Sequence, residues 1–206
     1  MERPAVVDAH VHFWDPEELT YPWLNDVASL QRAFLPSDYR AAAAPARIDK
    51  VLFVEGNCSP TQSFEEVALI ERLRQRDNRI SGIVAYVDLT DERSRGRTLE
   101  RLSDHAQVKG VRHSIQGAPA GLALQRSFVE GVRAVAAAGF TFDLCVTHDQ
   151  LADTTELVAQ CPAAKFVLDH CGKPPIRDAL IEPWRTHLRA LAAFDNVCCK
   201  ISGLLT

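Results

Sequence analysis

The sequence predicts an α/β protein in which strands and helices alternate along the whole chain. Short runs of apolar and β-branched residues, typical of buried strands, are separated by segments with apolar residues at helical spacing, and Gly or Pro stands at several of the boundaries. Seven strand segments of this kind occur, with no glycine-rich dinucleotide fingerprint after the first. Strands that alternate with helices pair in parallel and are connected by right-handed crossovers.

These features predict a (β/α)8 TIM barrel that is incomplete in this chain, with about seven strands. A complete barrel usually takes about 250 residues, and this chain has 206. We therefore expect a single domain over residues 1–206, truncated before a seventh helix and an eighth strand. The alternative is an open, flavodoxin-like sheet, which would leave strand edges of an apolar chain exposed.

The expected elements follow from the pattern of apolar residues. The predicted strands are 6–12, 50–57, 80–89, 108–115, 141–148, 165–171 and 196–204. The predicted helices are 37–44, 63–77, 91–105, 122–138, 149–160 and 178–194. Ser63 followed by Glu66 predicts a capping box at the start of the second helix, and Gly139 predicts the end of the fourth. The long connection 15–36 carries several aromatic residues, and we expect it to be a flap over the site.

Composition limits the partners. The net charge is −4 and there is no long Lys/Arg run, so we expect neither nucleic acid nor membrane as a partner. No signal segment or apolar run long enough to span a bilayer is present, which predicts a cytoplasmic protein. The six cysteines show no Cys-x-x-Cys spacing, which favours reduced thiols. A small-molecule substrate is therefore the expected partner, and a homo-oligomer is compatible with the sequence.

The first predicted strand carries two histidines that share a face. Side chains alternate along a strand, so His10 and His12 point to the same side, with Asp8 one step behind them. Two neutral imidazoles at this spacing suit a divalent metal, and they can also polarise a carbonyl group or hold a water nucleophile. The simpler alternative is a pair of hydrogen-bonded polar residues at a strand end. Their position favours the functional interpretation, because active residues of parallel α/β folds lie at the carboxyl ends of strands.

Polar residues also end the other predicted strands. If the strands form a barrel, their carboxyl ends meet at one mouth, whatever their separation in sequence. The residues expected there are His10, His12, Glu55, Asn57, Asp88, Arg112, His113, His148, Asp169, His170, Gly172 and Lys173. Each alone is a weak signal, but together they predict a hydrolytic centre, which needs several nitrogen donors around one carbonyl group.

Four motifs carry a resemblance to a known family. They are VDAHVHFWDP at 7–16, YPWL at 21–24, GVRH at 110–113 and FVLDHCGKP at 166–174. The chain resembles the amidohydrolase superfamily, and within it the amidohydrolase-2 branch that holds sugar-lactone hydrolases of the fuconolactonase and rhamnonolactonase kind. This resemblance implies a TIM-barrel hydrolase that opens a small lactone with water.

The resemblance also implies roles for individual residues. His10, His12 and His148 match the family's metal-binding histidines, and many members bind one divalent ion, often zinc, while some lactonases work without metal. His170, His148 and Arg112 are the expected catalytic residues, with Arg112 stabilising the developing oxyanion and His170 transferring a proton. The expected substrate-binding residues are Arg112, His113, Glu55, Trp14 and Lys173.

One family feature is missing from the sequence. The family carries an aspartate at the end of its eighth strand, in a Gly-Ser-Asp-Trp-Pro-like motif, as metal ligand and general base, and this sequence contains no such motif. We expect a fragment of a longer protein; the alternative is a protein that has lost its base, with a rate loss of about 10²- to 10⁴-fold.

Three other functions stay open at this point. The first is a decarboxylase of the same superfamily that acts on an aromatic or muconate-type acid, with the arginine gripping a carboxylate. The second is a non-catalytic barrel remnant that acts as a binding module. The third is an amide hydrolase, which only the Trp14-Asp15-Pro16 context disfavours, by resemblance.

Overall fold

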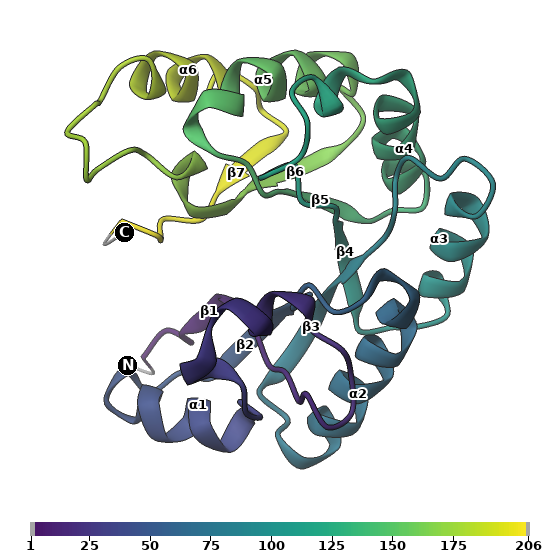
Figure 1. Cartoon of the computed structure of the whole chain (residues 1–206), viewed down its shortest axis with the longest axis vertical. Coiled ribbons are helices and arrows are strands. Elements are labelled where there is room, and N and C mark those ends of the chain that lie inside the picture. The colour runs from purple at the N-terminus through teal and green to yellow at the C-terminus, as the bar shows by residue number, and fades with distance from the viewer. Residues whose placement is uncertain (1–2, 205–206) are drawn as a thin grey trace. The chain divides into compact units, whose positions relative to one another are not determined.

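The computed structural model describes residues 3–204, so the ends of the predicted domain, 1–2 and 205–206, lie outside the described part of the chain. Two compact units can be distinguished. The first comprises Met1–Tyr86 with Ala106–Lys109, and the second comprises Val87–His105 with Gly110–Thr206. Strands and helices alternate through both units (Figure 1). That residues 1–206 fold as one domain stays a prediction.

The seven predicted strands are all present within residues 3–204, and each ends earlier than predicted. They are β1 Val7–Val11, β2 Lys50–Val54, β3 Ile80–Tyr86, β4 Val108–Arg112, β5 Thr141–Leu144, β6 Lys165–Leu168 and β7 Val197–Cys199. Pairing is parallel from β1 to β3 and from β4 to β7, in the order of the chain. This order and direction are those expected of a (β/α) barrel.

The strands end early because an apolar run reports burial and not strand pairing. Val87 follows β3 and Val146 follows β5, and both side chains are buried although neither residue belongs to a strand. His10 and Arg112 belong to β1 and β4, but the other polar residues that were predicted to end the strands lie in the loops that follow them. Loops held by a rigid scaffold are the usual place for functional residues.

The first unit contains β1, β2 and β3 with two helices, α1 (Pro36–Ala43) and α2 (Ser63–Arg76). The expectation that the first strand is buried is wrong. Val7 is 50% exposed and Ala9 is exposed, whereas Asp8 and His10 are half-buried. Because side chains alternate along a strand, this pattern shows that β1 buries mainly the face that carries His10.

The capping box predicted from Ser63 and Glu66 is also wrong. Ser63 is the first residue of α2, and the preceding Gln62 makes no side-chain cap. Glu66 is buried, and its Oε1 accepts a hydrogen bond of 3.0 Å from the backbone N–H of Gly56. A buried carboxylate needs such a donor, so Glu66 stabilises the loop after β2 and does not cap its own helix.

The connection 15–36 is an ordered layer of the first unit. It contains two short 3-10 helices, η1 (Pro22–Asp26) and η2 (Ala28–Leu30). Trp14 and Phe34 exchange backbone hydrogen bonds of 3.1 and 2.9 Å, and the indole N–H of Trp23 donates to the Gly56 carbonyl at 2.8 Å. Its proposed role as a flap over a site stays a prediction.

The second unit contains the rest of the strands and helices. Its helices are α3 (Arg95–Ser103), α4 (Arg126–Ala137), α5 (Leu151–Gln160) and α6 (Trp184–Leu191). Phe128, Phe142 and Phe166 form a chain of edge-to-face rings, with centroids 6.0 and 6.3 Å apart, in the core. Gly139 follows α4 with φ 82°, a conformation that favours glycine, which confirms the predicted helix end.

Two further expectations concern thiols and membranes. All six cysteines are free, as predicted. Four are buried, and Cys198 and Cys199 are exposed. Among residues 3–204 there is no helix whose length and apolar character would let it cross a membrane.

Two helical glycines provide a matched test of the packing in the second unit. A Cβ at Gly131 in α4 would lie 2.6 Å from the Leu89 carbonyl oxygen, whereas one at Gly96 in α3 would meet no atom within 4 Å. We expect Gly131→Ala to lower the free energy of unfolding by about 1–3 kcal/mol through overpacking. Gly96→Ala should leave it unchanged or raise it by up to about 1 kcal/mol. Urea denaturation measures both, and equal effects would contradict the close approach of α4 to Leu89.

Candidate active site

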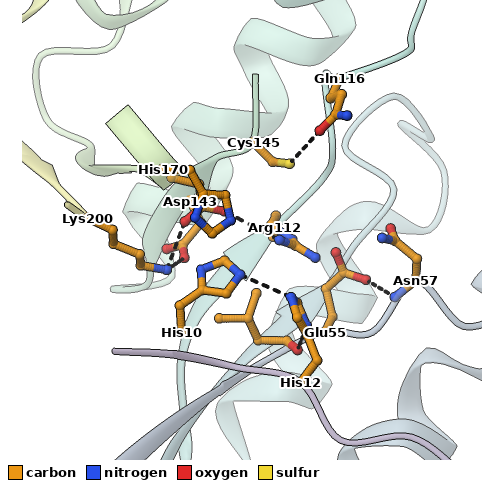
Figure 2. Close-up of polar contacts among 12 residues, drawn as sticks. His10, His12, Glu55, Asn57, Arg112, Gln116, Asp143, Cys145, His170 and Lys200 are labelled. Atoms are coloured by element: carbon orange, nitrogen blue, oxygen red, sulfur yellow. Dashed lines mark hydrogen bonds and ion pairs between the residues drawn. The ribbon is translucent and has the colours of Figure 1, made fainter. Parts of the chain in front are cut away.

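The predicted site residues divide between the two units. The first unit holds His10, His12, Trp14 and Glu55, and the second holds Arg112, His113, His148, His170 and Lys173. Of these residues, Figure 2 shows His10, His12, Glu55, Arg112 and His170. Within each unit the structure brings together a distinct polar cluster.

In the first unit, His10 and His12 form a close pair at the end of β1. Their Nε2 atoms lie 3.0 Å apart, and the two rings meet edge to face with centroids 4.8 Å apart (Figure 2). His12 Nδ1 lies 2.8 Å from the carbonyl oxygen of Val54. Because a carbonyl oxygen can only accept, Nδ1 of His12 carries the proton and Nε2 of the neutral ring carries the lone pair.

The backbone of His10 is also held in place, by the side chain of Asp8. The Asp8 carboxylate accepts hydrogen bonds from the backbone N–H of His10 at 3.1 Å and from the Tyr39 hydroxyl at 2.8 Å. Burial and the bond to Asp8 raise the pKa of Tyr39, so this hydroxyl stays protonated and remains a donor. The strand that carries the histidines is thus tied to α1 by a polar contact.

The histidine pair fits a divalent metal ion. Zinc lies about 2.0–2.1 Å from imidazole nitrogen, so two histidine ligands of one ion have nitrogens roughly 3 Å apart. A metal-binding histidine also usually donates its other N–H to a carbonyl or carboxylate, as His12 does to Val54. The nitrogen spacing of 3.0 Å and this orienting bond meet both requirements.

Glu55 and Trp14 are held by their own surroundings. Glu55 is buried, and its Oε2 accepts the backbone N–H of Asn57 at 2.7 Å. The Trp14 indole donates to the Leu30 carbonyl at 3.2 Å and packs on Phe34 with ring centroids 4.6 Å apart. A cavity of about 480 Å³ in the first unit is lined by residues that include His12 and Trp14. Substrate binding by Glu55 and Trp14 stays a prediction.

In the second unit, three buried charged residues and the half-buried Lys200 form a network. Lys200 Nζ is bonded to Asp143 and lies 2.9 Å from Asp169 Oδ1, and Arg112 Nη1 lies 3.4 Å from Asp169 Oδ2 (Figure 2). Asp169 is 0% exposed, and the Lys200 side chain is 9% exposed. Burial raises the pKa of Asp143, and the Lys200 ammonium opposes this shift. Two cations therefore balance two carboxylates inside the protein.

This network contains residues that sequence reasoning did not single out. Asp143 and Lys200 were not predicted, and Asp169 was expected only as one of many polar strand-end residues. A charged residue inside the short apolar strand Thr141–Leu144 is the signal that points to Asp143, because a buried charge requires a partner. Arg112 was predicted to stabilise an oxyanion, and the structure shows its guanidinium held by Asp169.

His170 lies in an unusual turn after β6. Four consecutive residues, His170, Cys171, Gly172 and Lys173, have φ between 50° and 67°. Left-handed backbone is strained for residues other than glycine and persists only where the surroundings hold it. The indole of Trp184 donates to the Cys171 carbonyl at 2.7 Å, and His170 Nδ1 lies 2.8 Å from the Ser202 hydroxyl. Strain of this kind often marks functional sites.

The remaining predicted histidines have different environments. His113 Nδ1 accepts the backbone N–H of Leu89 at 3.0 Å, and its ring packs against Phe128 at 5.4 Å. Burial lowers the pKa of His113, so the ring is neutral and Nε2 carries the proton. His148 begins the short 3-10 helix His148–Gln150 and is half-buried. Their functional roles stay predictions.

Lys173 belongs to a small polar group. Its Nζ donates to Gln116 Oε1 and lies 3.8 Å from the Cys145 sulfur. The lysine is half-buried and is the last residue of the left-handed turn. Its position is therefore set by the same backbone that places His170, and its predicted contact with substrate stays untested.

Comparison with known proteins identifies relatives along almost the whole chain. The model of the amidohydrolase family (Amidohydro_2) matches residues 7–206. An L-fucono-1,5-lactonase of Burkholderia multivorans is 29% identical over 208 residues, which cover 97% of this chain and 68% of the relative. An L-fucono-1,5-lactonase of Burkholderia ambifaria is 27% identical, with 97% and 68% covered.

Solved structures give the same result for the fold. A crystal structure of an amidohydrolase from Burkholderia multivorans with bound zinc has a TM-score of 0.83 and 28% identity, covering 98% of this chain and 70% of that one. An amidohydrolase 2 from Bifidobacterium longum subsp. infantis has a TM-score of 0.77 and 29% identity, with 97% and 73% covered. The predicted fold class, an incomplete (β/α)8 barrel with seven strands, is thereby confirmed.

The charged network in the second unit yields a test by substitution. Lys200→Met leaves Asp143 and Asp169 without their shared cation, and breaking a buried pair in this way costs about 3–5 kcal/mol at pH 7. The unpartnered carboxyls then have folded-state pKa values above their unfolded values, so protonation stabilises the fold. The loss should therefore shrink as the pH falls from 7 toward 5.

Urea denaturation at both pH values measures this effect. Lys165→Met, at an exposed position in β6, is the matched control and should change the free energy of unfolding little at either pH. A loss for Lys200→Met that grows on acidification would contradict the proposed balance of charges.

Proposed function

Since the chain belongs to the amidohydrolase family and is a hydrolase of that family, we propose that it opens a small sugar-acid lactone by attack of water on the ester carbonyl. Two relatives over 97% of its length are named as L-fucono-1,5-lactonases, which supports this substrate class.

The observation that carries the proposal is the His10–His12 pair. Both Nε2 atoms come together at 3.0 Å, and Val54 fixes the orientation of His12. Two neutral imidazole nitrogens held in this way can bind and orient a water molecule for attack on a carbonyl carbon. A structural pair of surface histidines would not need the orienting bond.

We propose that His10, His12 and His148 hold a divalent metal, with zinc as the first candidate. A relative whose structure contains bound zinc supports this assignment. Such an ion polarises a carbonyl group and lowers the pKa of bound water when it is present. In a metal-independent reaction, the same histidines would orient the water by hydrogen bonds alone.

The remaining predicted residues take separate roles in the proposal. His170 transfers the proton to the leaving hydroxyl group, because the unperturbed pKa of histidine lies near neutral pH. Arg112 stabilises the negative charge that develops on the carbonyl oxygen, and its bond to Asp169 keeps the guanidinium in place before the reaction. Contacts with the lactone ring and its hydroxyl groups are assigned to Trp14, Glu55, Arg112, His113 and Lys173.

Substitution of the histidine pair tests this function. The double variant His10→Ala with His12→Ala should lower hydrolysis of a panel of aldonolactones by at least about 10²-fold, because water is no longer oriented. Acid release followed in weakly buffered solution measures the rate, and elemental analysis measures bound metal. His187→Ala, in α6 and outside the predicted site, should leave both unchanged.

A wild-type rate in the double variant would contradict the proposed site. Carbon dioxide release from an aromatic acid, without ring opening of any lactone, would instead support the decarboxylase alternative. In that reaction the Arg112 guanidinium would bind a carboxylate, as guanidinium groups commonly do.

A further inference from the structure

Residues 200–203 follow β7, and the first of them, Lys200, contacts the turn that carries His170 through its backbone. The backbone N–H of Lys200 donates to the Leu168 carbonyl at 2.9 Å, and the N–H of Cys171 donates to the Lys200 carbonyl at 3.1 Å. These two bonds continue the pairing of β6 with β7 beyond the last strand residues. The backbone of Lys200 therefore holds the left-handed turn by hydrogen bonds with the residues on both sides of Asp169 and His170.

The side chain of Lys200 adds an ionic contact to the same turn. Its Nζ lies 2.9 Å from Asp169, the residue directly before His170, and is also bonded to Asp143 in β5. Both carboxylates are buried, and the Lys200 side chain is 9% exposed. A buried ion pair of this kind loses much energy when one partner moves away, so it fixes the start of the turn relative to β5 and β7.

Ser202 contacts the imidazole itself. Its hydroxyl oxygen lies 2.8 Å from His170 Nδ1, a normal hydrogen-bond distance. A hydroxyl group can donate to an unprotonated Nδ1 and accept from a protonated one. When Nδ1 carries the proton, the Ser202 oxygen accepts it whether or not Nε2 is protonated, so the bond persists while Nε2 gains and loses a proton.

Gly203 completes the contact by leaving room for the ring. A Cβ built at this position would lie 2.9 Å from His170 Cβ and 3.3 Å from Cγ. Gly203 also has φ 65°, where a side chain is strained. Any other residue at position 203 would push against His170.

We propose that residues 200–203 form a positioning element for His170, in which Lys200 holds the left-handed turn and Ser202 orients the imidazole. The proposal rests on the proposed role of His170 in proton transfer. Partners that orient a functional histidine through its second ring nitrogen commonly change activity by about 10- to 100-fold when they are removed. Ser202 is thus a positioning residue for the reaction and does not itself contact the lactone.

The test compares Ser202→Ala with Ser202→Thr, which keeps the hydroxyl group. We expect Ser202→Ala to lower kcat for lactone hydrolysis by about tenfold or more with little change in KM, because ring orientation and not substrate binding is lost. Ser202→Thr should recover most of kcat. Ser103→Ala removes a similar hydroxyl bond, to the Leu99 carbonyl in α3, and should have no effect on kcat.

A second readout needs no substrate. In protein with ¹⁵N-labelled histidine, the ring nitrogen signals of His170, assigned with His170→Gln, should shift in Ser202→Ala and return toward wild type in Ser202→Thr. Gly203→Ala places a methyl group against Cβ and Cγ of His170, so it should also shift the ring nitrogen signals.

Unchanged ring signals in Ser202→Ala would overturn the proposal, as would an equal loss of kcat in Ser202→Ala and Ser202→Thr. A wild-type protein that opens no lactone would overturn the proposed function instead. The ring signals would then still decide whether Ser202 orients His170.

Discussion

The neutralisation of two buried carboxylates by Lys200 and Arg112 is the constraint on which the second unit depends. Asp143 and Asp169 come from neighbouring strand segments, and neither can be ionised inside an apolar core without a cation close by. Lys200 satisfies both from the end of β7, which requires β5, β6 and β7 to keep their register. The backbone pairs Asp143↔Val167 and Val167↔Cys198 show that register. The charges therefore specify how the strands align, beyond what apolar packing alone demands.

In the first unit, hydrogen bonds with the backbone hold the histidine pair in place. His12 Nδ1 lies 2.8 Å from a backbone carbonyl oxygen, and the backbone N–H of His10 donates to the Asp8 carboxylate, which brings the two Nε2 atoms to 3.0 Å from each other. A neutral nitrogen with an available lone pair is what metal binding or water orientation requires. In both units, a candidate site residue is held by a partner that is distant in sequence: Val54 contacts His12, and Ser202 contacts His170.

The strands supply rigidity and the loops after them supply chemistry. His10 and Arg112 lie within β1 and β4, but the other strands end before the polar residues that were predicted to terminate them. Glu55, His148 and His170 therefore lie on turns whose backbone is set by local hydrogen bonds. The left-handed turn at His170 is the clearest case, because its strain is tolerated only where the end of β7 and Trp184 hold it. Because His170 lies in this turn, the turn and not the direction of β6 determines how its side chain is oriented.

The sequence by itself determined the alternation of strands and helices, the number of strands and the shared face of His10 and His12. These properties depend on apolar periodicity and on the two-residue repeat of a strand, which are local. Strand ends, the burial of Glu66 and the exposed face of β1 were not predictable, because an apolar run reports burial and not pairing. Only the tertiary structure decided that Lys200 joins Asp143, 57 residues away, and that Ser202 meets His170. Such contacts arise when parallel strands bring distant segments side by side, and no local pattern records which polar groups will then face each other.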